Sequence, residues 1–212
     1  MRTAANIKGV TFRPWIGSTF ESSKTRPRIL IVGQSHYDWK DRKREKVSLA
    51  RVTRKVIENY IASGKRAFFT KITSTVLGKR CPDGKQRAAF WNGVAFYNFI
   101  QEFVGDKPRL AHRYDLWKKS YPAFRAVLQR LQPDLIVVLG HMNYLNGPED
   151  GHQGKTLRSG PPQYCETWYY PTGPRSHALA VHVKHPSTGY KFSQFAPLVK
   201  EAKSRVRRTK SR

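Results

Sequence analysis

Acidic residues are scarce in this chain of 212 residues, which has 14 Asp and Glu against 40 Lys and Arg and a formal charge of +26. Enzymes that cleave phosphodiester bonds with Mg²⁺ normally need clustered carboxylates, so this chemistry is disfavoured. Long apolar segments are also missing, because no run of about 18 apolar residues exists that would span a bilayer. We therefore expect a soluble, strongly basic protein.

Cysteines and cofactor motifs are equally sparse. The two cysteines, Cys81 and Cys165, lack the spacing of metal ligands and fit a reducing compartment better than a disulfide scaffold. The first 15 residues contain no apolar core of signal-peptide length. No glycine motif for binding phosphate or a dinucleotide follows the first apolar run. These absences predict a cytoplasmic, nucleoid-associated protein that uses neither metal nor cofactor.

The positive charge indicates the class of partner. Each Lys or Arg that neutralises a phosphate releases a condensed counterion, so a polyanion gains affinity for such a chain. A membrane surface is a weaker alternative, because the sequence shows no basic amphipathic helix with an unbroken apolar face. We expect a monomer whose partner is nucleic acid, and a ribosome-like or merely soluble basic protein is the other interpretation.

Hydrophobic patterning predicts the α/β class. Short apolar runs typical of buried strands occupy residues 28–33, 135–140 and 177–187. Apolar residues at helical spacing occupy residues 41–63, 121–132 and 190–206. This alternation predicts a single domain over residues 1–202, a three-layer α/β/α sandwich around a central, mostly parallel sheet.

The remaining segments carry weaker signals. Residues 66–78 predict irregular structure or a short strand, and the centre of 90–105 is open between a strand and a short helix. Gly and Pro in 146–176 predict a loop. Residues 203–212 are expected to form a basic, mobile tail.

Polar residues cluster directly after the three expected strands, in the stretches "GQSHYDW" (33–39), "GHMNYLNG" (140–147) and "KHPSTGYKF" (184–192). The carboxyl ends of parallel strands meet at one edge of a sheet and form its ligand crevice. We therefore expect the functional site at this edge.

Two of these stretches resemble motifs of the uracil-DNA glycosylase superfamily. "VGQSHYD" (32–38) resembles its first motif, which in the best-known branch reads Gly-Gln-Asp-Pro-Tyr-His, and "HPSTGYKF" (185–192) resembles its last, which begins His-Pro-Ser. The stretches "FYNFIQ" and "LIVVLGHM" fit the order between them, so the resemblance covers about residues 28–200. It implies the family's fold and a DNA glycosylase that extrudes uracil or another modified base and hydrolyses its N-glycosidic bond, in DNA repair or in attack on foreign modified DNA.

The resemblance also implies roles for the last motif. His185 would donate a hydrogen bond to the anion that develops on the departing base. Ser187, with free backbone N–H groups beside it, would hold a DNA phosphate, and Lys191 would also contact DNA. Tyr190 would fill the stack that the base vacates, although Gly189 lies nearer the matching position.

The first motif departs from the family at the residue that orients the attacking water. Gln34 matches the family, and Tyr37 corresponds to the aromatic residue that screens the base, but Ser35 replaces the usual Asp. Asp38 or His36 would orient the water instead, or the enzyme would rely on charge stabilisation with a loosely held water. Asp38 equally fits an N-cap for the helix expected to begin near residue 41. The departure leaves open whether the base is uracil or a deaminated, damaged or enzymatically modified base.

Base recognition is assigned to Asn98, because one amide offers both a donor and an acceptor to a base edge; Asn92 and Asn143 are alternatives. The aromatic residues that could stack on the flipped base are Trp39, Phe68, Phe69 and Trp91. The basic segments 40–46 and 203–212 would bind phosphates without reading sequence.

A second class of function fits the same residues. The missing Asp of the first motif is also expected in a catalytically silent nucleic-acid-binding protein that kept the glycosylase fold. A glycosylase and a silent binding protein differ in whether abasic sites form in DNA.

Overall fold

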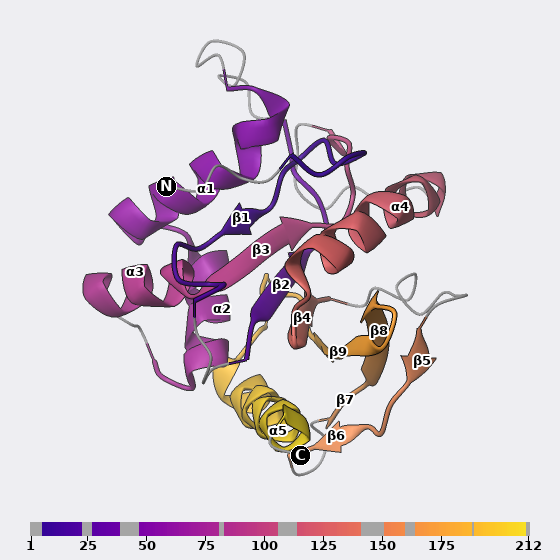
Figure 1. Cartoon of the computed structure of the whole chain (residues 1–212). Coiled ribbons are helices and arrows are strands. Elements are labelled where there is room, and N and C mark those ends of the chain that lie inside the picture. The colour runs from indigo at the N-terminus through magenta and orange to yellow at the C-terminus, as the bar shows by residue number, and fades with distance from the viewer. Residues whose placement is uncertain are drawn as a thin grey trace.

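A seven-stranded mixed sheet forms the centre of the computed structural model (Figure 1). The structure describes residues 6–22, 27–38, 47–80, 83–105, 114–140, 151–159, 164–187 and 189–210. The strands of the sheet, in spatial order, are β1 (Trp15–Ile16), β3 (Val94–Asn98), β2 (Ile29–Gly33), β4 (Leu135–Leu139), β9 (Ser176–Val183), β8 (Thr167–Gly173) and β5 (His152–Gln153). A separate pair is formed by β6 (Leu157–Arg158) and β7 (Tyr164–Cys165).

The sheet is parallel at its centre and antiparallel at its edges. Strands β3, β2, β4 and β9 pair in parallel, whereas β1, β8 and β5 join antiparallel. Strands β8 and β9 are connected by a turn of two residues, which only an antiparallel pair can accommodate. The predicted α/β class is confirmed, and the mostly parallel arrangement holds for the four central strands alone.

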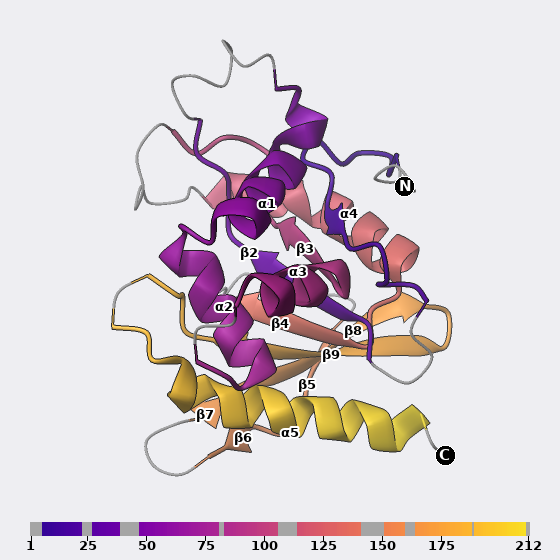
Figure 2. The ribbon, with the colours of Figure 1, turned by 90° about the vertical axis from the view of Figure 1, so that its left-hand side faces the viewer.

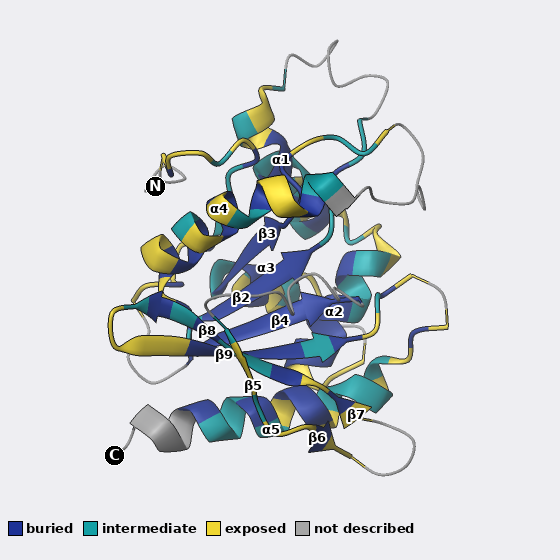
Figure 3. Cartoon of the chain, turned by 90° about the vertical axis from the view of Figure 1, so that its right-hand side faces the viewer, coloured by how far each residue is buried: buried dark blue, intermediate teal, exposed yellow. Residues whose placement is uncertain are grey.

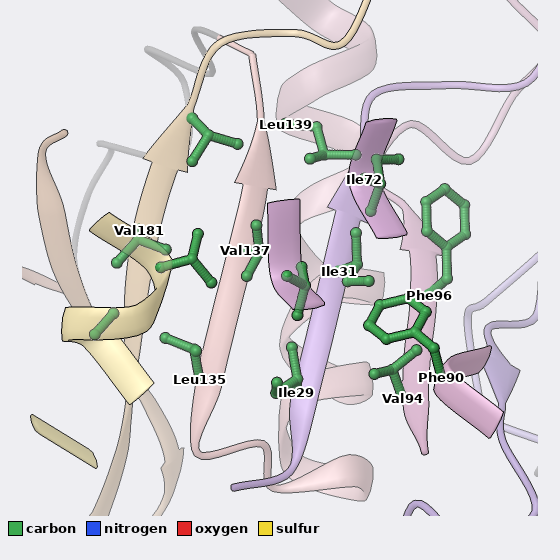
Figure 4. Packing of buried hydrophobic residues seen from close by; sticks show 14 of the residues in the cluster. Ile29, Ile31, Ile72, Phe90, Val94, Phe96, Leu135, Val137, Leu139 and Val181 are labelled. Atoms are coloured by element: carbon green, nitrogen blue, oxygen red, sulfur yellow. The ribbon is translucent and has the colours of Figure 1, made fainter. Parts of the chain in front are cut away.

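Helices pack on both faces of this sheet. They are α1 (Val52–Ser63), preceded by a 3-10 turn (Leu49–Arg51), α2 (Ala67–Leu77), α3 (Gly84–Asn92), α4 (Tyr114–Leu131) and α5 (Phe192–Lys210). Ile29, Ile31 and Val137 face the side covered by α1, α2, α3 and α5, where Ile72 and Phe90 pack close to the strands (Figures 2 and 4).

The opposite face of the sheet is covered by α4. Because side chains alternate along a strand, Leu30 and Val32 point to this face and pack with Phe124 and Val127 of α4. The central strands are therefore buried on both sides (Figure 3). Within the described ranges, no helix is both long enough and apolar enough to cross a membrane.

The predicted helices at 121–132 and 190–206 are confirmed, and both are longer than expected. The helix predicted at 41–63 corresponds to α1, which runs from Val52 to Ser63. Residues 39–46 lie outside the described residues. The prediction of a separate tail from residue 203 is wrong, because α5 continues to Lys210. The Lys203 ammonium donates to the carbonyl of Val76, and Val206 is buried in the core.

Residues 66–78, expected to be irregular or a strand, form the helix α2. Phe69, Ile72 and Val76 are buried at helical spacing. The β-branched residues between them bond within the helix, since the hydroxyls of Thr73 and Thr75 each donate to the carbonyl four residues earlier at 2.8 Å. Tertiary packing and these bonds outweigh the strand propensity that the sequence suggested.

Two further ambiguities are resolved by the structure. The segment 90–105 contains the end of α3 and then the buried strand β3. The described parts of the predicted loop at 146–176, residues 151–159 and 164–176, instead contain β5, β6, β7, β8 and the first residue of β9. The loop prediction was wrong for β8 because Pro171 and Gly173 are residues typical of loops. In the structure, the pairing of β8 with β9 is irregular between these two residues, and this irregularity accommodates them.

Candidate active site

The carboxyl ends of the four parallel strands lie at one edge of the sheet. Gly33 at the end of β2 is in register with Asn98 at the end of β3, and Leu139 of β4 is in register with Val183 of β9. The chain leaves these strands through the loops that carry both sequence motifs. The first and last of the three predicted stretches therefore begin at this edge, whereas residues 141–147 of the second lie outside the described residues.

Gly33 and Asn98 are in close contact. The side-chain amide nitrogen of Asn98 donates to the carbonyl of Ser35 at 3.0 Å, and a Cβ added to Gly33 would collide with the Asn98 amide oxygen. Asn98 is 6% exposed. It lies where a base-reading residue was predicted, but the contact that the structure gives it ties the ends of β2 and β3 together.

Gln34 and His185 approach each other above Gly140. A Cβ placed on Gly140 would lie 3.1 Å from Nε2 of Gln34 and 3.4 Å from Cβ of His185. Gly140 also has a φ of +102°, which favours glycine, and its N–H donates to the carbonyl of Val183 at 2.7 Å. The first and last motifs thus lie next to a position where a side chain would be strained.

His185 is held by its own turn and by helix α2. Its Nδ1 lies 3.0 Å from the hydroxyl of Ser187, and its ring lies 5.3 Å from the ring of Phe68, measured between centroids. The imidazole is partly buried and Ser187 is exposed. A histidine with one ring nitrogen oriented by a hydroxyl is suited to hydrogen bonding with a ligand through the other.

His36 does not fit the predicted role of orienting a water. Its side chain is buried, its Nε2 lies 2.9 Å from the hydroxyl of Thr53, and its ring packs edge-on against Phe12 with centroids 5.0 Å apart. Burial lowers the pKa of His36 to about 3, so the ring stays neutral in the folded protein. His36 belongs to the packing that supports the first motif.

The buried neutral state of His36 predicts a loss of stability in acid. In the unfolded state the His36 ring binds a proton below a pH of about 6.5, whereas in the folded state it does so only near pH 3. As the pH falls through this window, His36 should therefore lower the free energy of unfolding by up to ~1.4 kcal/mol per pH unit. Urea unfolding between pH 7 and 4 measures this slope. His36→Gln should show a shallower slope, and the exposed His177, replaced by Gln, should not. Equal slopes in all three proteins would contradict the assignment.

Ser35, Tyr37 and Asp38 are partly buried at the same edge. The N–H of Asp38 donates to the carbonyl of Gly105 at 2.9 Å, which joins the first motif to the segment after β3. Of residues 34–38, Asp38 alone carries a carboxylate. The described helix α1 is preceded by a 3-10 turn whose N-cap is Ser48, so Asp38 does not cap this helical segment.

Tyr190 does not lie where a residue inserted into DNA would be. It is 6% exposed, its hydroxyl lies 2.7 Å from the hydroxyl of Thr75, and its ring stacks on Phe195 with centroids 4.9 Å apart. Burial raises its pKa to about 12. The prediction of a DNA wedge does not fit this placement, because the side chain joins α2 to α5; Lys191, the next residue, is exposed.

Among the candidates for base stacking that the structure describes (Phe68, Phe69 and Trp91), Phe68 is the one whose ring contacts His185. Phe69 is 6% exposed in the core, and Trp91 is fully buried, its indole N–H donating to the hydroxyl of Thr73. Asn92, an alternative base reader, ends α3 at the opposite edge of the sheet. Trp39, Asn143 and the segment 40–46 lie outside the described residues.

The sequence did not identify the contribution of α2 to this edge. Besides Phe68, the Lys71 ammonium donates to the carbonyl of Ser187 at 2.8 Å, and Thr75 bonds Tyr190. Once the segment is recognised as a helix, residues 68, 71 and 75 fall on one face, which is the signal that could have revealed them.

Two cavities lie elsewhere on the molecule. One of about 310 Å³ opens at the amino-terminal ends of β2 and β3, where Ile29 and Val94 line it. Another of about 540 Å³ lies between α4 and β8, where Arg125 and Tyr170 line it. Among the described residues, no three His, Cys, Asp or Glu side chains gather closely enough to hold a metal ion.

A scan against protein-family models gave no match, and a search of curated proteins gave no significant match. The geometry at the carboxyl edge and the two sequence motifs therefore carry the functional argument.

Proposed function

We propose that this protein is a DNA glycosylase of the uracil-DNA glycosylase superfamily, which flips uracil or another modified base out of DNA and hydrolyses its N-glycosidic bond. The observation that carries the proposal is the meeting of Gln34 and His185 above Gly140. These residues come from two motifs far apart in the sequence, each at the carboxyl end of a parallel strand. The helices on both faces of the sheet support the three-layer fold that the family implies.

The chemistry needs a group that stabilises negative charge on the departing base. In the tautomer in which Ser187 donates to Nδ1 of His185, the neutral ring carries its proton on Nε2 and can donate it in a hydrogen bond to the base. Because this bond strengthens as the base becomes an anion, it lowers the barrier more than it increases ground-state affinity. Gln34, whose Nε2 lies near Gly140 as His185 does, would offer an amide to the base edge.

DNA is the partner that the charge of +26 supports. Exposed Lys184 and Lys191 flank His185 and would contact phosphates on either side of an extruded nucleotide. Extrusion costs a few kcal/mol, which such contacts would offset. The proposal has the DNA backbone run along the turn between β9 and α5. Ser187 does not fit the expected phosphate contact, because its N–H donates to the carbonyl of His185 at 2.9 Å and its hydroxyl is engaged with the imidazole.

The water-orienting group is assigned to Asp38, because Ser35 replaces the family's Asp and His36 is buried. Asp38→Asn should slow base excision by about 10²-fold with unchanged DNA affinity, while Ser35→Ala should change the rate little. Single-turnover rates and the melting temperature Tm should be measured on both variants. A lower Tm with a normal rate would assign Asp38 to structure, and a slow Ser35→Ala would transfer the role to that hydroxyl.

A panel of duplexes, each with one modified base, tests the proposed function. Alkali cleavage after incubation reports abasic sites, and His185→Ala serves as the inactive control. The alternative, a nucleic-acid-binding protein without activity, is favoured by the missing Asp of the first motif and by the engagement of the Asn98 amide with Ser35. Binding to every duplex without cleavage of any would support that alternative.

A further inference from the structure

Helix α2 contacts the turn that carries His185 at three points along one face. The contacts are the ring of Phe68 against His185 (5.3 Å between centroids), the ammonium of Lys71 with the carbonyl of Ser187 (2.8 Å), and the hydroxyl of Thr75 with that of Tyr190 (2.7 Å). Residues three and four apart lie on the same face of a helix, so residues 68, 71 and 75 form one row. Figure 2 shows the turn after β9 passing beside α2.

We propose that Lys71 is a positioning residue for His185. Its ammonium fixes the carbonyl of Ser187, and the hydroxyl of Ser187 in turn bonds Nδ1 of the imidazole at 3.0 Å. The lysine thus sets the orientation of the ring without touching the base. The inference rests on the proposed function for its catalytic part, whereas the support of the turn by Lys71 can be measured without a substrate.

The middle of the turn depends on this contact. The turn begins at the end of β9 and is anchored at its other end by the buried Tyr190. Between these points Pro186 is buried and the N–H of Ser187 donates to the carbonyl of His185 at 2.9 Å, but His185 is only partly buried and Ser187 is exposed. The contact from Lys71 therefore adds to what holds these two residues. A hydrogen bond from an ammonium group to a carbonyl is charge-assisted and therefore among the stronger ones.

A different role for Lys71 would be direct binding of a DNA phosphate. A phosphate contact adds to affinity and to its salt dependence, and removing it lowers the salt slope by about 1. A positioning residue acts on the chemical step, because a displacement of about 1 Å at a reacting group can cost 10²-fold in rate. The two roles therefore separate in binding and in rate measurements.

Hydrogen–deuterium exchange of the peptide 184–191 tests the structural part. Lys71→Met should accelerate exchange about tenfold or more, while Lys71→Arg should retain most of the protection. Lys79→Met is the matched control, because it removes the same charge from an exposed lysine beyond the other end of α2. Lys71→Gln serves as a second variant. Unchanged exchange in both neutral variants, or failure of both to fold, would overturn the inference.

Single-turnover excision tests the catalytic part. Lys71→Met should slow base release about 10–100-fold, with DNA affinity and salt slope equal to those of Lys79→Met, and Lys71→Arg should restore the rate. Loss confined to affinity, with a salt slope lower than that of Lys79→Met, would overturn the inference in favour of phosphate binding. A wild-type protein that cleaves no substrate, combined with the predicted exchange result, would refute the glycosylase and leave the support of the turn by Lys71 standing.

Discussion

Replacing His185 by alanine is expected to slow base release by at least about 10²-fold while leaving DNA affinity nearly unchanged. The hydrogen bond from the imidazole strengthens mainly as charge develops on the departing base, so its loss acts on the transition state. The measurement is single-turnover base release with enzyme in excess, together with equilibrium binding to the same duplex.

The control for this substitution is His177→Ala, which changes an exposed histidine at the opposite end of β9. It should keep the wild-type rate. His185→Asn should be as slow as His185→Ala if the imidazole supplies the essential donor. Full activity of His185→Ala would show that the alignment of "HPS" with the family's last motif is wrong.

Affinity for non-specific duplex DNA is expected to fall by several orders of magnitude between about 50 and 200 mM salt. With a net charge of +26, many phosphates should be neutralised on binding, and 6–10 such contacts correspond to a loss of about 10³–10⁵ over this range. Fluorescence anisotropy with a labelled duplex at several salt concentrations gives the slope. A flat response would contradict the expectation of a nucleic-acid partner.

The contribution of the C-terminal basic residues to DNA binding is best tested by a truncation that leaves the packing of α5 intact. Removal of residues from 203 onward would take away the contact of Lys203 with Val76 and the buried Val206. Truncation after Val206 spares both and still removes four basic residues, Arg207, Arg208, Lys210 and Arg212. This shorter protein should bind DNA with a shallower salt slope and an unchanged Tm.

The central strands β2 and β4 were predictable because burial on both faces leaves a nearly continuous apolar run, whereas β3, equally buried, was left open between a strand and a helix. The runs at 28–33 and 135–140 are almost wholly apolar, as a parallel strand covered on both sides requires. Helix α2 was not predictable from propensity, because its threonines and aromatic residues favour strands until their hydroxyls bond the preceding turn. Strand β8 was missed because Pro171 and Gly173 resemble loop residues when their pairing partner is unknown.

The location of the site was predictable for a topological reason. Polar loops after parallel strands must gather at one edge, and this placed Gln34 and His185 near each other. Which loop residues face inward was not predictable, as the burial of His36 and Tyr190 shows. The support from Lys71 was hidden because its partner Ser187 is distant in the sequence, and neither residue signals the other.

Release of a free base by the wild-type protein tests the proposed glycosylase most directly. Duplexes carrying uracil or other deaminated, damaged or enzymatically modified bases should be incubated with the protein, and the products should be identified by mass spectrometry. The proposal predicts that at least one duplex yields a free base and an abasic site in equal amounts, and that the His185→Ala protein yields both at least about 10²-fold more slowly. Tight binding of all these duplexes without release of any base would contradict it.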